Sequence, residues 1–209
     1  MKSILCFGDS NTWGYDPVTK EQFSEEIRWT GLLREKLKDV NIIEDGVCGR
    51  TTVYKDKNRP GIIGIESIRN IFVDGNDIDG VVLMLGTNDC KSCFNASPKE
   101  IARGINMCLD IILEYVLPQN VLLVSPIHLG EDVWKENFDP EFNETSVAVS
   151  KGLKNEYLKI AQKRNLRFIA ASDHVQPSTA DQEHLSKEGH FELSNVIYNE
   201  VIKIMAEVL

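Results

Sequence analysis

The chain has 209 residues, a length typical of one domain, and we expect residues 1–209 to form a single unit. A net charge of -9, with scattered lysines and arginines, argues against nucleic acid and anionic membranes as partners. No segment has the roughly 20 apolar residues that a membrane-spanning helix needs. Five cysteines, an odd number, do not predict a disulfide framework, and we expect a cytoplasmic protein without a secretory signal.

Five short apolar runs rich in β-forming residues predict strands at 2–7, 40–44, 80–85, 120–125 and 166–171. Between them, apolar residues recur at helical spacing over 29–37 and 101–113. Further helices are predicted over 151–163 and after Ser186, a candidate cap. The last helix would bury one apolar stripe, consisting of Leu193, Val196, Ile197, Val201, Ile204, Met205 and Val208.

Strands and helices therefore alternate along the chain, a pattern that requires crossover connections and a parallel sheet. The runs "VVLML" and "VLLV" are apolar at nearly every position, which indicates a sheet covered on both faces. These observations predict a three-layer α/β/α sandwich with about five parallel strands. The polar stretches 16–27 and 131–147 are predicted to be long surface loops near a site or a subunit contact.

In an open parallel sheet, ligands bind beyond the carboxyl ends of the strands. Polar and glycine residues follow several of the predicted strands, namely Gly8 to Asn11, Gly46 to Arg50, Gly86 to Asp89, and, after the fifth strand, His174, Asp181 and His184. Because these ends meet at one edge of the sheet, we expect the side chains to share one site.

The residue types at this edge suit acyl transfer, which needs a nucleophile, a base, a group that orients the base, and donors for the oxyanion. Ser10 supplies a hydroxyl, His184 an imidazole, and Asp181 a carboxylate three residues before it. Gly49 offers an unobstructed N–H and Asn88 an amide. Each residue alone has a structural explanation, such as a helix cap for Ser10, but their joint placement favours a catalytic site.

Four separated blocks carry a resemblance to a known family: "FGDSN", "DGVCGRTT", "LGTND" and "DQEH". In order and spacing the chain resembles the SGNH hydrolases, also called GDSL-type esterases. The resemblance implies a flavodoxin-like fold with Ser10 as nucleophile, His184 as base and Asp181 as its orienting acid. It also implies an oxyanion hole of the Ser10 N–H, the Gly49 N–H and the Asn88 side chain, with no cofactor.

The stretches "ILCFGDSNTWGY", "RWTG", "GRTT" and "MLGTND" are similar to the arylesterase and acyltransferase branch of this family. The branch implies a small-molecule ester as substrate, short acetyl or aryl esters in particular, an acyl-serine intermediate, some capacity for acyl transfer, and a homo-oligomer. Trp13 and Tyr15 are expected to line the acyl pocket. Asn11, which replaces the leucine of the family's nickname, and His128 are expected to contact substrate.

Alternatives within the family are a carbohydrate acetylesterase and a thioesterase or lysophospholipase with the same catalytic residues. A non-catalytic, doubly wound regulatory domain is a more distant alternative, because Asp9 and Asp89 follow the first and third strands. It would need a lysine after the fifth strand, where the chain has Ala171 and Ser172. We expect no metal site, because Cys90 and Cys93 have no second ligand pair at zinc spacing.

Overall fold

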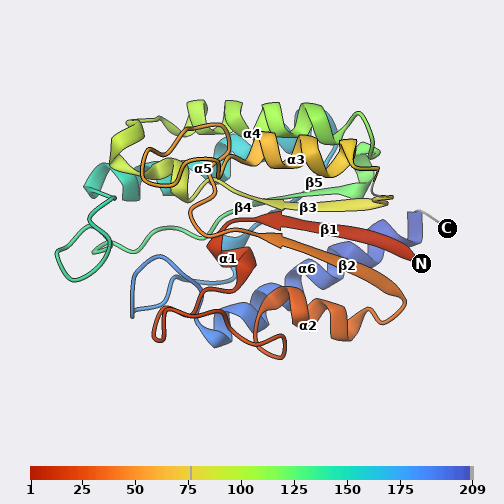
Figure 1. Cartoon of the computed structure of the whole chain (residues 1–209), viewed down its shortest axis with the longest axis horizontal. Helices are drawn as coiled ribbons and strands as arrows, with labels where there is room; N and C mark the ends of the chain where they lie inside the picture. Colours follow the sequence, from red (N-terminus) through yellow and green to blue (C-terminus); the bar gives the residue numbers. More distant parts are fainter. Residues whose placement is uncertain (76, 208–209) are drawn as a thin grey trace.

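The computed structural model describes residues 1–75 and 77–207 and has a five-stranded parallel sheet between two layers of helices (Figure 1). The strands are β1 (Lys2–Gly8), β2 (Val40–Gly46), β3 (Gly80–Met84), β4 (Val121–Ser125) and β5 (Arg167–Ala170). The α-helices are α1 (Ser10–Trp13), α2 (Trp29–Lys36), α3 (Gly64–Val73), α4 (Pro98–Ile112), α5 (Glu144–Arg164) and α6 (Lys187–Glu207). Short 3₁₀ turns are η1 (Asn88–Cys90), η2 (Ser92–Phe94), η3 (Pro118–Asn120) and η4 (Ala171–Asp173). The predicted three-layer fold and its five strands are confirmed.

The strand order is β2-β1-β3-β4-β5, so the direction of progression reverses beside β1. Ile4 of β1 pairs with Ile42 on one side and with Gly80 on the other, both in parallel. A crevice forms at such a switch point outside the carboxyl ends of the strands. The chain segments that leave β1 and β3 therefore begin at the same crevice.

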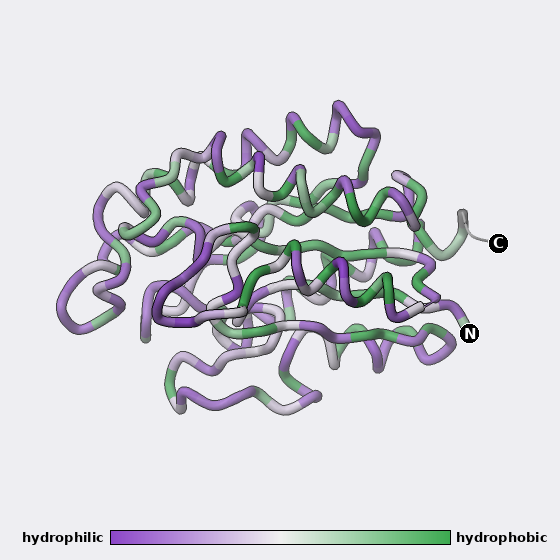
Figure 2. Tube along the Cα trace, turned by 45° about the horizontal axis from the view of Figure 1, so that its top comes forward, coloured by the Kyte–Doolittle hydropathy of each residue, from purple (hydrophilic) through white to green (hydrophobic). Residues whose placement is uncertain are grey.

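Side chains of the central strands alternate between two apolar clusters, one in each helical layer. Leu5 and Phe7 belong to the cluster with α3, α4 and α5, whereas Ile4 and Cys6 belong to the cluster with α2 and α6. Figure 2 shows the same arrangement as hydrophobic strands between helices whose hydropathy alternates along the chain. Burial on both faces explains why these strands read as continuous apolar runs.

Three of the predicted helices, α2, α4 and α6, are confirmed, and Ser186 caps α6 by accepting a hydrogen bond from the Gly189 N–H at 3.1 Å. In the predicted apolar stripe of α6, the buried residues are Leu193, Ile197, Val201 and Ile204, Val196 and Met205 are half-buried, and Val208 lies outside the described residues.

Two helices differ from the prediction. Helix α5 begins at Glu144, seven residues before the predicted start, because Asn143 accepts a hydrogen bond from the Ser146 N–H at 2.9 Å and caps the helix. The predicted loop therefore ends at residue 143 rather than 147. Helix α3 was not predicted; it buries Ile68 and Phe72.

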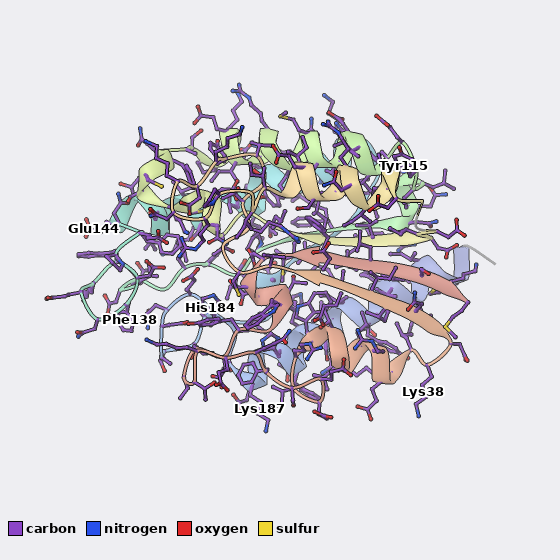
Figure 3. All side chains as sticks on the ribbon, viewed as in Figure 1. Lys38, Tyr115, Phe138, Glu144, His184 and Lys187 are labelled. Atoms are coloured by element: carbon purple, nitrogen blue, oxygen red, sulfur yellow. The ribbon has the colours of Figure 1, made fainter. Side chains whose placement is uncertain are left out.

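The residues near the site and those at the opposite end of the molecule lie at opposite ends of the strands. His184 and Phe138 lie on the side where the strands end, and Lys38 and Tyr115 lie on the side where they begin (Figure 3). Among the described residues, no helix has both the length and the apolar content to cross a membrane.

Leu83 in β3 is fully buried, and Leu83→Ala should lower the free energy of unfolding by about 2–5 kcal/mol through lost burial and the cavity left behind. Urea denaturation measures this loss. Val18→Ala is the control, because Val18 is 74% exposed and its truncation should change stability by less than about 0.5 kcal/mol. Equal losses in the two variants would contradict the central position of β3.

Candidate active site

Ser10 lies at the first position of α1, directly after the turn that ends β1. The cap of this short helix is Asp9, whose carboxylate accepts a hydrogen bond from the Asn11 N–H at 3.0 Å. A side chain at Gly8 would lie 2.0 Å from the Thr12 hydroxyl, so the tight turn requires glycine there. Because Asp9 performs the capping, the Ser10 hydroxyl is free for another partner.

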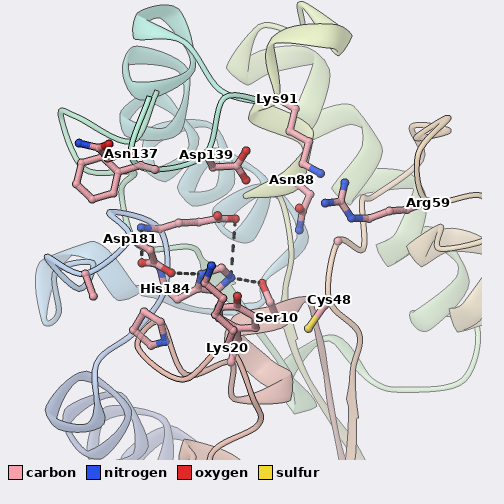
Figure 4. A pocket seen from close by; sticks show the side chains of 16 residues that line it. Ser10, Lys20, Cys48, Arg59, Asn88, Lys91, Asn137, Asp139, Asp181 and His184 are labelled. Carbon is pink, nitrogen blue, oxygen red and sulfur yellow. Dashed lines mark hydrogen bonds and ion pairs between the residues drawn. The ribbon is translucent and has the colours of Figure 1, made fainter. Parts of the chain in front are cut away.

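The partner of Ser10 is His184, which the chain places 174 residues away. The His184 Nε2 lies 2.8 Å from the Ser10 Oγ, and its Nδ1 lies 2.6 Å from Asp181 Oδ2 (Figure 4). The other oxygen of Asp181 accepts hydrogen bonds from the Glu183 and His184 N–H groups, both at 3.0 Å. The turn 181–184 thus fixes the carboxylate and presents the imidazole to Ser10.

Asn11 holds the histidine segment against α1. Its Oδ1 accepts a hydrogen bond from the Leu185 N–H at 2.9 Å, and its Nδ2 donates to the Glu183 carbonyl at 3.5 Å. The Trp29 indole N–H donates to the Asn11 carbonyl at 3.0 Å. Both ends of the buried Asn11 amide thus bind backbone, and Asn11 does not line the pocket that contains Ser10, so its contact with substrate stays a prediction.

Gly49 lies in a turn that follows β2 and adopts a φ of 81°, in the left-handed region that favours glycine. A side chain at this position would lie 2.3 Å from the Arg59 Cδ, which covers the Gly49 Cα. Among the described residues, no protein acceptor takes the Gly49 N–H. This donor is therefore available at the edge of the pocket that Gly49 lines.

Buried Arg50 joins the turn of Gly49 to β1 and to Asn88. Its guanidinium donates to the Gly8 carbonyl at 2.9 Å and to the Asp45 carbonyl at 2.7 Å. The Arg50 carbonyl accepts one hydrogen of the Asn88 amide at 3.2 Å. That contact orients the Asn88 side chain, which lines the same pocket as Ser10 (Figure 4).

The pocket has a volume of about 300 Å³, and buried Ser10 is among the residues that line it. Residues from both predicted surface loops line it, including Pro17 and Lys20 from the first and Asn137, Phe138 and Asp139 from the second. The other lining residues are Ser10, Tyr15, Cys48, Gly49, Arg59, Asn88, Lys91, Ala180, Asp181, Glu183 and His184. Tyr15, which was predicted to line the acyl pocket, lines this pocket, and its ring lies 4.3 Å from the His184 ring, centroid to centroid.

Trp13 and His128 do not line this pocket, and their expected contact with substrate stays a prediction. The Trp13 ring lies 6.4 Å from the Tyr15 ring, centroid to centroid, and only Tyr15 of the two lines the pocket. His128 follows β4 and is half-buried. The next residues, Leu129 and Gly130, donate hydrogen bonds to the Ser150 hydroxyl at 3.1 Å and to the carbonyl of Gln182, beside Asp181, at 2.7 Å.

The sequence did not indicate a cluster of four charged residues beside the oxyanion donors. Lys91, only 2% exposed, lies 2.8 Å from Glu141 and 3.2 Å from Asp56. Arg59 binds the same two carboxylates at 2.8 and 3.2 Å. This Arg59–Lys91 cluster joins three loops, and only its spatial arrangement, not a motif or a spacing, reveals it.

Burial and pairing shift the pKa values of Asp181 and His184 in opposite directions. Burial lowers the pKa of His184, but Glu183 and Asp181 outweigh burial and raise it above its ordinary value. Burial raises the pKa of Asp181, but the hydrogen bonds and charge of His184 outweigh burial and lower it. The Asp181 carboxylate therefore stays ionised and stabilises a proton on His184.

Within residues 1–75 and 77–207, no group of three or more His, Cys, Asp or Glu side chains is arranged to hold a metal ion. Cys90 is buried beside Gly86, whose carbonyl its thiol contacts at 3.4 Å, whereas Cys93 is exposed. The two cysteines therefore lie in different environments, both as free thiols.

The sequence profile of the GDSL-like lipase/acylhydrolase family matches residues 6–192. The chain belongs to this family. A carbohydrate acetylesterase from Sinorhizobium meliloti has a similar solved structure, with 33% identity, a TM-score of 0.88, and 98% of this chain and 100% of that chain covered. An aryl esterase from M. smegmatis, at 29% identity, has the same TM-score and coverage. No curated protein sequence matches the chain.

Family membership makes the protein a carboxylic ester hydrolase, and it confirms the resemblance stated from the four blocks. A putative arylesterase from Agrobacterium tumefaciens, at 25% identity and a TM-score of 0.85, covers 96% of this chain and 99% of its own. The similar structures thus include esterases of two named kinds, and they do not decide between these kinds for this chain.

Asn11→Ala should lower the free energy of unfolding by about 1–3 kcal/mol, because it leaves the buried Leu185 N–H without an acceptor. Since the same contact positions His184, kcat for para-nitrophenyl acetate should fall more than KM changes. Urea denaturation and steady-state kinetics measure both effects. Asn137→Ala is the control, because its exposed amide lines the pocket without holding this segment. A rise in KM alone would instead indicate that Asn11 contacts substrate.

Proposed function

We propose that the protein hydrolyses esters of short acyl chains through an acyl intermediate on Ser10. The observation that carries this proposal is the continuous line of hydrogen bonds from Asp181 through His184 to Ser10. This is the arrangement of a serine nucleophile, a general base and an orienting carboxylate. It lies at the bottom of a pocket in a chain of an esterase family.

In the first half of the reaction, His184 Nε2 removes the Ser10 proton as the Oγ attacks the ester carbonyl carbon. The carbonyl oxygen becomes an oxyanion that accepts hydrogen bonds from the Ser10 N–H, the Gly49 N–H and the Asn88 amide. Asp181 stabilises the imidazolium that forms. When the intermediate collapses, the bond to the alcohol oxygen breaks, and His184 donates its proton to that oxygen.

In the second half, a water molecule enters where the alcohol left. His184 removes its proton, the water oxygen attacks the acyl carbon, and the Ser10 Oγ leaves and regains a proton from His184. An alcohol in place of water gives acyl transfer by the same steps. Both outcomes use the same residues, so the balance between them depends on what occupies the pocket beside His184.

Two features of the pocket support a short acyl chain. Its volume of about 300 Å³ is at the low end for small-molecule sites. Charged side chains line much of it, among them Arg59, Lys91, Asp139 and Glu183, and a long alkyl chain would desolvate them without supplying hydrogen bonds. These features favour acetyl and similar esters over the lipid esters of a lysophospholipase.

Ser10→Ala should lower kcat/KM for para-nitrophenyl acetate by about 10⁴-fold or more, as loss of a catalytic serine does elsewhere. A fluorophosphonate probe should modify Ser10, and peptide mapping by mass spectrometry identifies the site. Ser24→Ala is the control, because this exposed serine lies outside the pocket. Labelling at another residue, or near-normal activity in Ser10→Ala, would overturn the proposal.

Activity should rise with pH as His184 loses its proton, because only the neutral imidazole can act as base. Since Glu183 and Asp181 outweigh burial and raise the pKa of His184, the midpoint in kcat/KM should lie above the ordinary histidine value of about 6.5. Kinetics with para-nitrophenyl acetate between pH 5 and 9, roughly the range in which histidine titrates, measure it. A flat profile would contradict a histidine base.

A further inference from the structure

Glu183 is a buried carboxylate inside the pocket that no step above uses. The residue is 6% exposed, yet among the described residues no donor makes a hydrogen bond to its carboxylate. A buried charge without a donor is costly, and such groups are usually paired in proteins. The carboxylate lies 3.9 Å from His184 Nε2, an ion pair when the imidazole is protonated but not a hydrogen bond, so a carboxylate that lines the pocket in this way can accept a hydrogen bond from the substrate.

The position of Glu183 is set by its backbone and leaves the side chain directed into the pocket. Its N–H donates to Asp181 Oδ1 at 3.0 Å, and its carbonyl accepts from the Asn11 amide at 3.5 Å. Both contacts belong to the structure that positions His184. The carboxylate therefore lies close to the imidazole, with Glu183 Oε1 3.9 Å from His184 Nε2.

The distance between Glu183 and His184 suits one bridging group. Glu183 Oε1 lies 3.9 Å from His184 Nε2, too far for a direct hydrogen bond. The same Nε2 lies 2.8 Å from the Ser10 Oγ. An oxygen atom of a substrate can lie within hydrogen-bond distance of both Nε2 and the Glu183 carboxylate, or two neighbouring oxygens can bind one each.

The proposed reaction places the alcohol part of the ester at this point. His184 Nε2 donates a proton to the alcohol oxygen as it leaves, so that oxygen must lie beside Nε2. A hydroxyl on the next carbon of the alcohol then lies on the side of Glu183 and can donate to the carboxylate. An alcohol without such a hydroxyl would leave the carboxylate buried and unpaired.

We infer that Glu183 is a specificity-determining residue that selects esters of polyhydroxylated alcohols by accepting a hydrogen bond from the hydroxyl next to the ester. This inference rests on the proposed function and names its substrate class. In the catalytic cycle, the ester enters with this hydroxyl on Glu183, the acyl group moves to Ser10, and the alcohol departs with its hydroxyls unchanged. No other bond to the alcohol forms or breaks.

The charge around the pocket favours a neutral polyol over a cationic alcohol as the partner of Glu183. Three basic side chains (Lys20, Arg59, Lys91) and three acidic ones (Asp139, Asp181, Glu183) line the pocket, so their charges balance and the lining suits a neutral alcohol. Burial, with a smaller contribution from nearby Asp139 and Asp181, raises the pKa of Glu183 to about 7 against the opposing effect of His184. The carboxylate is therefore ionised in a large fraction of molecules at and above neutral pH, the form that accepts a hydroxyl.

The test compares two acetate esters that differ only in hydroxyl groups, glycerol 1-acetate and propyl acetate, with acetate release followed at pH 8. The wild-type protein should prefer glycerol 1-acetate in kcat/KM by about 10- to 100-fold, the effect of one hydrogen bond to a charged group. Glu183→Leu should reduce this preference to nearly one. Glu183→Gln retains an uncharged acceptor oxygen and should keep an intermediate preference.

The ratio of the two substrates separates recognition from changes in His184. Removing the Glu183 charge also lowers the pKa of His184, but this affects both esters alike and cancels in the ratio. Asp132→Asn is the matched control, because it removes one negative charge on an exposed loop outside the pocket and should leave the ratio unchanged. Activity on propyl acetate reports that each variant is folded.

Three results would overturn the inference: a wild-type ratio near one, a preference that survives in Glu183→Leu, or a stronger preference for the cationic ester acetylcholine. The Ser10→Ala variant distinguishes a failure of the inference on Glu183 from a failure of the proposed function. If Ser10→Ala loses activity on both esters while Glu183→Leu keeps the polyol preference, the serine mechanism stands and only the role of Glu183 fails. If Ser10→Ala remains active, the proposed function itself fails.

Discussion

The site depends on the hydrogen bonds by which the side chain of Asn11 holds the backbone of residues 183–185. Asn11 belongs to the first turn after β1, and the residues it binds precede the last helix, 172 and 174 positions later in the chain. Together with the hydrogen bond from the Gly130 N–H to the Gln182 carbonyl at 2.7 Å, this contact holds the turn that carries Asp181 and His184 beside Ser10. Buried polar networks that are fully satisfied specify one arrangement, and this one specifies the arrangement of the three residues.

The buried charged side chains at this edge of the sheet are of two kinds, those with hydrogen-bonded partners and one without. Arg50 and Lys91 have carboxylate or carbonyl partners for their charges, and these contacts join the loops that present Gly49 and Asn88. Glu183 has no donor among the described residues and lies beside the reacting atoms. The first arrangement rigidifies the donors for an oxyanion, and the second leaves one buried acceptor available to a ligand. In the function proposed above, the two features together favour small polar esters, whereas an apolar pocket would select for chain length.

Much of the fold could be predicted from periodicity. Strands buried on both faces are continuous apolar runs, and helices such as α4 carry an apolar stripe, so both signals are local. Helix α3 was missed although Ile65, Ile68 and Phe72 recur at helical spacing, since it is short and its first turn has no side-chain cap, and α5 began earlier because the capping contact of Asn143 is not visible in apolar spacing. In the site, the motifs indicated Ser10, Asp181 and His184, and the structure brings them into contact. The motifs did not indicate that the Asn11 amide binds the backbone of residues 183 and 185, because only the folded chain brings these partners to it.

The sequence by itself determined the order of strands and helices, the chemical types at the ends of the strands, and the family to which the chain belongs. These follow from residue identity and local spacing. The tertiary structure alone decided which polar side chains face the pocket, because the direction of a side chain in a loop depends on contacts from distant segments. Glu183 stands between Gln182 and His184 in an unremarkable turn of the sequence. Its burial without a donor, 3.9 Å from the imidazole, exists only after the loops 16–27 and 131–143 have closed around it.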